Sequence, residues 1–254
     1  KQKDVLNSPD YSFATNGDKP IVNCLNLTES KIGDICDCVT GFYSGNDKDY
    51  LKVRDKSIRN SKRYEVVNLD FVEFNCDASL VDGLTNGKEY VSIVKGGNRK
   101  YYKPDDWFMN WSSEKVDFFK SDKKARYQNS SYYFRKGIGV PMVSSSSITG
   151  ALIENRLFDQ SIVGIFPKDE AYLYYLLAFF NSPTCNKLIR TINSSTNNSS
   201  NYIKKIPFLE PENHVLEKIN ERVKTILEAC KTSHDYDCKL EELNNNAIKE
   251  IYGF

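Results

Sequence analysis

The chain has 254 residues, of which 40% are hydrophobic and 13% aromatic, so it can bury a core and is not a disordered chain. Its length fits one large domain or two small ones. The 35 Lys and Arg residues nearly balance the 34 Asp and Glu residues, and the net charge of +1 argues against binding nucleic acid through bulk positive charge. No segment has the roughly 18–20 apolar residues of a membrane span or the pattern of a signal peptide. We therefore expect a cytoplasmic protein with no membrane partner.

The first 160 or so residues are expected to form short strands joined by loops. Alternating or β-like composition predicts strands over 64–74, 90–94, 132–134, 138–143 and 162–166. The aromatic spacing over 105–119 predicts a helix in which Trp107 and Trp111 lie in the core.

After Pro167 the pattern becomes helical. Leu, Phe and Tyr recur at helical spacing over 169–181, and a second short helix is expected after Pro183. The Asn, Ser and Thr residues of 193–201 predict a polar loop. Two apolar stripes after Pro211 predict an antiparallel helix pair, with Val215, Ile219, Val223, Ile226 and Cys230 on one helix and Leu240, Leu243, Ala247 and Ile251 on the other.

Together these elements predict an α+β fold, strand-rich to about residue 166 and helical from about residue 169. It should have peripheral helices and end in the antiparallel helix pair. We expect residues 1–209 to form one domain and residues 210–254 a C-terminal helical segment. Because the chain begins with Lys1, we expect it to be processed or a fragment of a larger protein.

The seven cysteines are odd in number and have no paired spacing, so reduced thiols are expected. Cys36 and Cys38 could share a strand face, with Cys24 and Cys76 as conceivable partners for zinc. No second Cys-x-Cys or Cys-x-x-Cys is present, however, so the sequence favours small buried hydrophobic residues over a metal site.

Charge is distributed unevenly along the chain. Residues 47–63 hold 7 basic and 3 acidic residues, and residues 95–140 hold 11 and 5, so these segments carry +4 and +6. In the second segment the basic residues are interleaved with tyrosines and tryptophans. Basic side chains neutralise phosphates, and aromatic or amide side chains stack on or bond to bases. The segment is therefore a candidate for nucleic-acid contact, and a solvated face with buried tyrosines is the alternative.

Catalytic motifs are largely absent. The sequence contains no nucleophile–histidine triad, no P-loop and no dinucleotide cradle, and residues 181–184 only superficially resemble the adenine-binding element of amino-methyltransferases. A Mg²⁺-nuclease pattern, Pro-Asp followed by Asp/Glu-x-Lys, occurs twice. One pairing is Pro9-Asp10 with 29–31, and the other is Pro104-Asp105 with 122–124. A Mg²⁺-dependent nuclease fragment is therefore an alternative function.

Several motifs follow one another in a characteristic order and spacing. They are Gly-Asp-Ile and Thr-Gly within 32–41, then Asn46 and Tyr50-Leu51; 132–138 with Pro141 and 144–147; 158–159 with 161–166; 176–182; 192–207; and 240–243 with 251–254. In this order they resemble the TaqI-like C-terminal specificity domain, or target-recognition domain, of adenine-specific type II DNA methyltransferases and fused restriction–modification enzymes. The run 192–207 is the most specific match.

The resemblance extends from about residue 30 to the end of the chain. It implies a non-catalytic module that reads double-stranded DNA for an adenine-N6 methyltransferase, whose N-terminal catalytic domain would be its second partner. It implies no cofactor in this chain, because S-adenosylmethionine would bind in the catalytic domain. A protein-interaction module, or a specificity subunit of a type I-like system, is a further alternative.

For such a module, side chains in and near the second basic segment are the expected DNA contacts. These candidates are Lys95, Asn98, Arg99, Lys100, Tyr101, Tyr102, Arg126, Arg135, Lys136, Ser144, Ser145 and Ser146. Thr40, Gly41 and Asn46 are expected to form a structural turn, and residues 193–201 a capped turn, more than DNA contacts.

Overall fold

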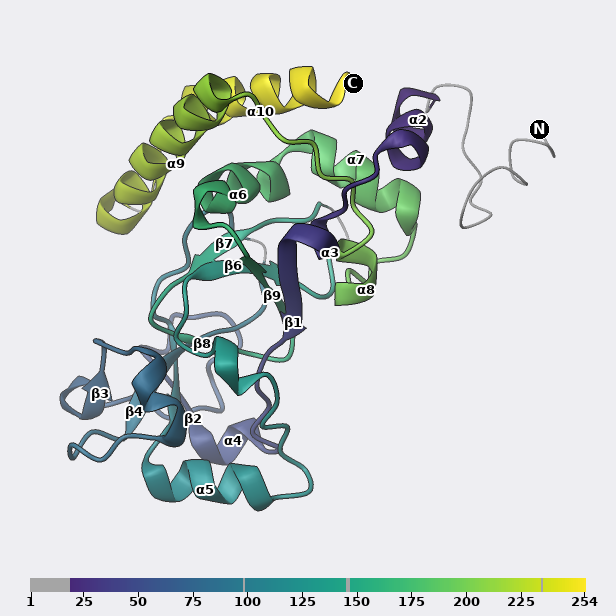
Figure 1. Ribbon diagram of the computed structural model, residues 1–254. Helices are drawn as coiled ribbons and strands as arrows, with labels where there is room; N and C mark the ends of the chain where they lie inside the picture. Colours follow the sequence, from purple (N-terminus) through teal and green to yellow (C-terminus); the bar gives the residue numbers. More distant parts are fainter. Residues whose placement is uncertain (1–18, 98, 145–146, 234) are drawn as a thin grey trace.

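The computed structural model describes residues 19–97, 99–144, 147–233 and 235–254. Figure 1 shows two sheets, one in the middle of the view and one below it, with most of the helices above the middle sheet. This arrangement confirms the predicted α+β fold. None of the helices in the described ranges combines the length and hydropathy that crossing a bilayer requires.

The middle sheet, called the main sheet below, has four antiparallel strands in the order β1-β9-β6-β7. The strands are β1 Cys36–Thr40, β9 Ile162–Pro167, β6 Gly137–Pro141 and β7 Ala151–Ile153. Along β9, Val163 and Ile165 face a large core shared with the helices, and Ile162 and Phe166 face a smaller core. Because both faces are covered, β9 is a continuous apolar run instead of an alternating one.

The lower sheet has five strands, in the order β2-β5-β4-β3 with β8 also paired to β4. Its strands are β2 Leu51–Val53, β3 Val72–Glu73, β4 Tyr90–Val94, β5 Trp107–Asn110 and β8 Leu157–Phe158. Two short helices, α4 Asp47–Tyr50 and α5 Ser113–Ser121, lie beside this sheet (Figure 1). Strand β8 lies between β7 and β9 in the chain, so its pairing with β4 fixes the two sheets to each other.

The remaining helices are α2 Lys19–Leu27, α3 Ile32–Ile35, α6 Leu173–Asn181, α7 Pro183–Ile192, α8 Ser200–Ile203, α9 Asn213–Ser233 and α10 Cys238–Tyr252, and the single 3₁₀ turns are Leu69–Phe71, Ala78–Asp82, Ser130–Tyr132 and Glu170–Tyr172. Most of these helices lie on the side of the main sheet away from the lower sheet, whereas the short helices α3 and α8 lie beside β1 (Figure 1). The predicted helices after Asp169, after Pro183 and from Pro211 are thus confirmed, including the C-terminal pair.

The predicted helix over 105–119 is wrong in its first half. Residues Trp107–Asn110 form β5, which pairs with β2 on one side and β4 on the other, and α5 begins only at Ser113. Two strands with unpaired edges on either side favour the extended backbone over a helix here. Trp111 is nevertheless fully buried, as expected, and its indole nitrogen donates to the Leu80 carbonyl at 2.9 Å.

Two predicted strands are also shorter or absent. Within 64–74 only Val72–Glu73 is a strand, because the Asn68 side chain accepts from the Asp70 amide at 3.1 Å and caps a 3₁₀ turn instead. Over 132–134 the chain turns, with Phe134 at a φ of 62°. The predicted strands at 90–94, 138–143 and 162–166 are confirmed as β4, β6 and β9.

The apolar stripe of α9 is buried as predicted, but that of α10 is rotated. Leu243 is 48% exposed, whereas Asn244 is buried together with Ile248 and Tyr252. The ring of Tyr252 stacks on Phe179 with centroids 5.1 Å apart, and its hydroxyl donates to the Pro207 carbonyl at 3.0 Å. These contacts fix the face that α10 turns to the core.

Cys36 and Cys38 lie in the large core, as the sequence favours. Burial raises the pKa of the Cys36 thiol well above its usual range and that of Cys38 to about 12, so both are protonated at neutral pH. Within the described ranges no three His, Cys, Asp or Glu side chains are grouped so that they could hold a metal ion.

Candidate nucleic-acid interface

A turn at Gly41–Tyr43 carries the chain from β1 in the main sheet towards α4 beside the lower sheet. The Phe42 amide donates to the Phe158 carbonyl and the Gln160 amide donates to the Phe42 carbonyl, both at 2.8 Å. Gly41 has no room for a side chain, because a Cβ would lie 2.0 Å from the Phe158 carbonyl oxygen. The structural role expected of Gly41 is therefore confirmed.

An ion-paired lysine lies directly beside this turn. Lys95, at the end of β4, donates to Asp47 at 2.6 Å and to Asp159 at 3.0 Å. Desolvation lowers the pKa of Lys95, but the carboxylates of Asp159 and Asp47 outweigh it and hold that pKa above its usual value. Lys95 therefore stays charged and joins α4, β4 and the turn before β9.

Ser161 extends this connection to the loop after β6. Its hydroxyl accepts from the Gly96 amide at 3.2 Å, and its carbonyl accepts from the Met142 amide at 2.8 Å. The loop at 142–144 in turn pairs with the polar tract 193–198. Ser144 donates its amide to the Thr196 carbonyl at 3.0 Å, and the Asn198 amide donates to the Met142 carbonyl at 2.6 Å.

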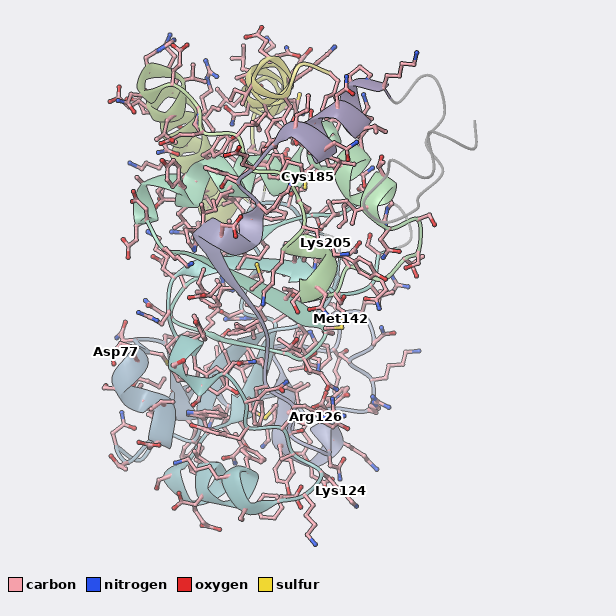
Figure 2. The ribbon with its side chains drawn as sticks, turned by 45° about the vertical axis from the view of Figure 1, so that its right-hand side comes forward. Asp77, Lys124, Arg126, Met142, Cys185 and Lys205 are labelled. Atoms are coloured by element: carbon pink, nitrogen blue, oxygen red, sulfur yellow. The ribbon has the colours of Figure 1, made fainter. Side chains whose placement is uncertain are left out.

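These contacts form one continuous surface of loops, which we call the loop face: residues 41–47, 95–97, 124–126, 142–144, 159–161 and 193–198. Arg126 joins it through backbone pairing with Tyr43, and Lys124 lies against Gly45. Figure 2 shows Lys124, Arg126 and Met142 along one side of the molecule, with Lys205 further along the same side. The loop face thus combines exposed basic side chains with exposed Ser, Thr and Asn side chains, which suits phosphates and base edges.

Three of the predicted contact residues lie on the loop face. Arg126 is exposed, Lys95 is held between its two aspartates, and Ser144 is 3% exposed with its hydroxyl donating to the Ser147 carbonyl at 2.6 Å. Asn98, Ser145 and Ser146 lie outside the described residues.

A second group of predicted residues lies against the helix pair. Lys100 forms an ion pair with Glu241 of α10, and Tyr101 is fully buried with its ring 5.3 Å from that of Tyr236. Arg99 next to them is exposed. This segment therefore holds the turn between α9 and α10, a role that local sequence does not reveal because the partners are about 140 residues away.

The remaining predicted residues are near α6 and the pocket. Arg135 lies over the Tyr132 ring at 5.9 Å, and Lys136 donates to the Tyr174 hydroxyl at 2.9 Å and approaches Glu154 at 3.6 Å. The predicted contacts thus occupy separate places and do not form one patch. Lys124, Thr196 and Asn197 on the loop face were not predicted, because only the tertiary pairing of loops places them beside Arg126 and Ser144.

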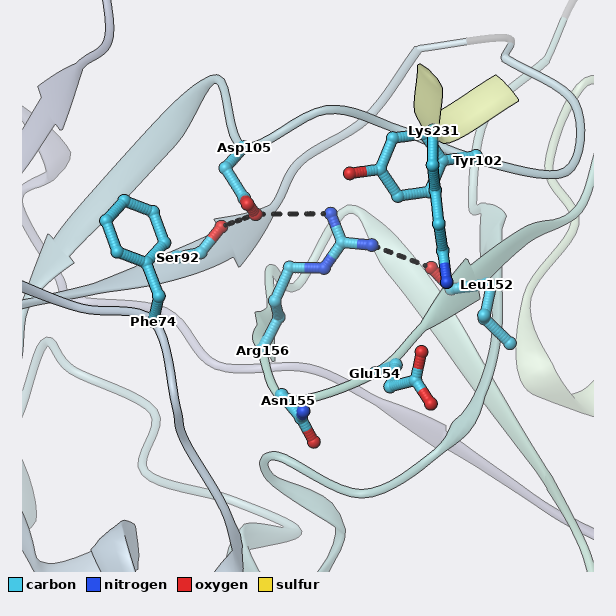
Figure 3. A pocket seen from close by; sticks show the side chains of 9 residues that line it. All are labelled: Phe74, Ser92, Tyr102, Asp105, Leu152, Glu154, Asn155, Arg156 and Lys231. Carbon is cyan, nitrogen blue, oxygen red and sulfur yellow. Dashed lines mark hydrogen bonds and ion pairs between the residues drawn. The ribbon is translucent and has the colours of Figure 1, made fainter. Parts of the chain in front are cut away.

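A pocket of about 160 Å³ lies between the lower sheet, the end of β7 and α9 (Figure 3). Arg156 is 7% exposed there, and its guanidinium donates to the carbonyls of Lys103 at 2.6 Å and Leu152 at 3.1 Å. It also lies over the Tyr102 ring at 5.5 Å and 3.4 Å from Asp105. Because these internal contacts use the guanidinium, the pocket is a structural junction of the two sheets more than an anion site.

Lys103 beside this junction is a pH-sensitive group. Burial, together with the charges of Arg156 and Arg99, lowers its pKa to about 8. The folded state thus loses the proton above about pH 8, whereas the unfolded state keeps it to about pH 10.4. The contribution of Lys103 to the free energy of unfolding should therefore rise between these pH values. We expect Lys103→Met to remove this rise, so that its stability relative to the wild type falls by up to about 3 kcal/mol from pH 7 to pH 10.

Urea unfolding at several pH values measures this effect. Lys115→Met, which changes a partly exposed lysine on α5, is the control and should give the same pH profile as the wild type. A Lys103→Met profile parallel to the wild type would contradict the lowered pKa of Lys103.

The nuclease pairing of Asp105 with 122–124, which lies within the described ranges, is not assembled as a metal site. Asp105 bonds to Ser92 and Arg156, whereas Asp122 accepts from the backbone amides of Lys124 and Ala125 at 2.9 and 2.8 Å, and the two carboxylates share none of these partners. Asp10 of the other pairing lies outside the described residues. Asn181 is the first residue of 181–184, the segment that superficially resembles the adenine-binding element of amino-methyltransferases. Its side chain donates to the carbonyls of Gly150 and Leu177, both at 2.8 Å, so its amide is structural.

No protein-family profile and no curated protein matches the sequence. Among solved structures, the HsdS subunit from Thermoanaerobacter tengcongensis matches 99% of this chain at 11% identity, with a TM-score of 0.30. The chain spans about half, 51%, of the length of that subunit.

Proposed function

We propose that the chain is a non-catalytic module that binds double-stranded DNA through the loop face and recognises a specific sequence for a restriction–modification system. The observation that carries the proposal is the loop face itself, where exposed basic residues adjoin exposed Ser, Thr and Asn side chains. Arg126 and Lys124 are exposed and would bind phosphates, and the exposed Ser, Thr and Asn side chains would bond to base edges. The resemblance of the motifs to specificity domains supports the same function.

The finer proposal is that the partner is an adenine-N6 methyltransferase domain of the TaqI-like type. Such an enzyme must rotate its target base out of the duplex, and it needs the DNA held in register while it does so. The module would supply that register, and S-adenosylmethionine and the catalytic residues would belong to the partner. A specificity subunit of a type I-like system would use the loop face in the same way.

Binding to a fluorescently labelled duplex, followed by anisotropy over a range of salt concentrations, tests the proposal. The logarithm of the affinity should fall linearly with the logarithm of salt, with a slope of about −0.9 for each phosphate contact. We expect the double variant Lys124→Glu/Arg126→Glu to bind all duplexes at least about tenfold more weakly and with a shallower slope.

The matched control is Lys218→Glu/Lys249→Glu, which reverses two exposed charges on the C-terminal helix pair. Its affinity should stay near that of the wild type. A third variant, Arg99→Glu, tests the segment beside the helix pair. If Arg99→Glu weakened binding and Lys124→Glu/Arg126→Glu did not, the loop face would be the wrong surface.

A further inference from the structure

One side chain adds to the backbone pairing between the two polar loops of the loop face. Arg190, in the last turn of α7, donates from one terminal nitrogen to the Ser195 carbonyl at 2.6 Å and to Asn198 Oδ1 at 3.3 Å. Its other terminal nitrogen donates to the Ser144 carbonyl at 3.0 Å. We call residues 142–144 and 193–198 the paired loops, and Arg190 is the residue that bonds to both.

The base of the paired loops is fixed by burial and hydrogen bonds. Asn198 is fully buried, and its side-chain nitrogen is 3.4 Å from the Pro141 carbonyl at the end of β6. Asn193 closes the tract at its other end, where its side chain accepts from the Ser195 amide at 3.1 Å and donates to the Asn197 carbonyl at 2.5 Å. Short loops fixed on a strand and a helix can hold side chains accurately enough for recognition.

The tip of the paired loops, formed by Val143, Ser194, Thr196 and Asn197, is exposed to solvent. Ser194, Thr196 and Asn197 are exposed, and within the described part of the chain their side chains form no hydrogen bond. Val143, in the facing loop, is 68% exposed. An Asn side chain can form two hydrogen bonds to the edge of an adenine, and Ser or Thr hydroxyls can donate to or accept from base edges. An apolar side chain can contact the methyl group of thymine.

We propose that the tip of the paired loops reads base edges, and that Arg190 is the positioning residue that holds it in place. This inference rests on the proposed function and specifies where the DNA sequence is read. Arg190 bonds to two backbone carbonyls and one side chain with a planar fork, which a lysine cannot reproduce. Arg190→Lys should therefore keep the charge and lose the positioning.

The test uses the 254-residue chain and a library of randomised 20-base-pair duplexes, from which bound DNA is sequenced. The wild type should enrich a motif. Arg190→Lys should bind the unselected library with unchanged affinity and salt slope, while its preference for the motif falls about 10-fold to 100-fold. Asn197→Ala should change the preference at one position of the motif. Arg222→Lys, a conservative change on α9, is the matched control and should change neither quantity.

Hydrogen–deuterium exchange without DNA gives an independent measurement. The Ser144 and Asn198 amides should exchange at least about tenfold faster in Arg190→Lys and at the wild-type rate in Asn197→Ala. Unchanged exchange with an unchanged motif would overturn the role of Arg190. Weaker binding to the unselected library with a shallower salt slope would also overturn it, because Arg190 would then contact a phosphate. A wild type that enriches no motif would instead overturn the proposed function.

Discussion

Gly41→Ala is expected to destabilise the protein by about 3 kcal/mol or more, one of the largest effects for a single methyl group. The added Cβ would lie 2.0 Å from the Phe158 carbonyl oxygen and 2.6 Å from that of Asp159. Both atoms are backbone, so no side chain can rotate away to relieve the contact. The turn would have to shift, and with it the hydrogen bonds that Phe42 makes to residues 158 and 160.

The measurement is urea or thermal unfolding followed by tryptophan fluorescence. Trp111 is a local probe, because its ring centroid lies 5.3 Å from that of Phe42. For a chain of this size the loss should lower Tm by about 6–12 °C. Gly96→Ala is the matched control on the same face, since its Cβ would meet only the Ser161 side chain, with the hydroxyl at 3.3 Å and the Cβ at 3.9 Å. Equal stability of the two variants would show that the turn accommodates a side chain and that the close approach is wrong.

Fold class follows from local pattern in this chain. The apolar run of β9 and the stripe of α9 are visible in the sequence because burial repeats at the period of each element. The helix predicted over 105–119 is wrong at Trp107–Asn110, because four residues are too few to distinguish the period of a helix from that of a strand. Neighbouring strands decide that segment, and they come from residues 51–53 and 90–94.

The site is less predictable than the fold. Basic residues are easily counted, but their availability depends on partners that are distant in the chain. Lys100 is 141 residues from Glu241, and Lys95 is 48 and 64 residues from its two aspartates. Residues 193–201 are expected from the sequence to form a capped turn, which describes the contacts of Asn193 well. The sequence does not show that residues 142–144 pair with this tract, and it is this pairing that forms the exposed tip.

Lys95→Met is the second variant with a large expected effect, about 2–3 kcal/mol of stability. Lys95 has 20% of its side chain exposed and Asp159 has 6%, so removing the ammonium leaves two carboxylates close together and partly desolvated. Urea unfolding measures the loss. Lys48→Met, an exposed lysine on the same short helix as Asp47, should change stability by less than about 0.5 kcal/mol.

A second change tests the cause of the loss. Asp159→Asn removes one carboxylate but can still accept from the Ser161 amide, which bonds to Asp159 at 2.8 Å. We expect Lys95→Met/Asp159→Asn to be more stable than Lys95→Met alone, because it removes the repulsion between the Asp47 and Asp159 carboxylates. If the double variant is less stable than Lys95→Met, packing and not charge explains the loss.

DNA binding shows whether Lys95 contacts a phosphate or only holds the surrounding elements together. Its ammonium already bonds to two carboxylates, so we do not expect it to contact a phosphate. Lys95→Met should therefore leave the salt slope of duplex binding unchanged. Arg126→Met, by contrast, should make the slope shallower by about 0.9. If Lys95→Met made the slope shallower instead, Lys95 would leave its aspartates to contact a phosphate. An unchanged slope would mean that Lys95 acts on DNA only by holding α4, β4 and the turn before β9 in one surface.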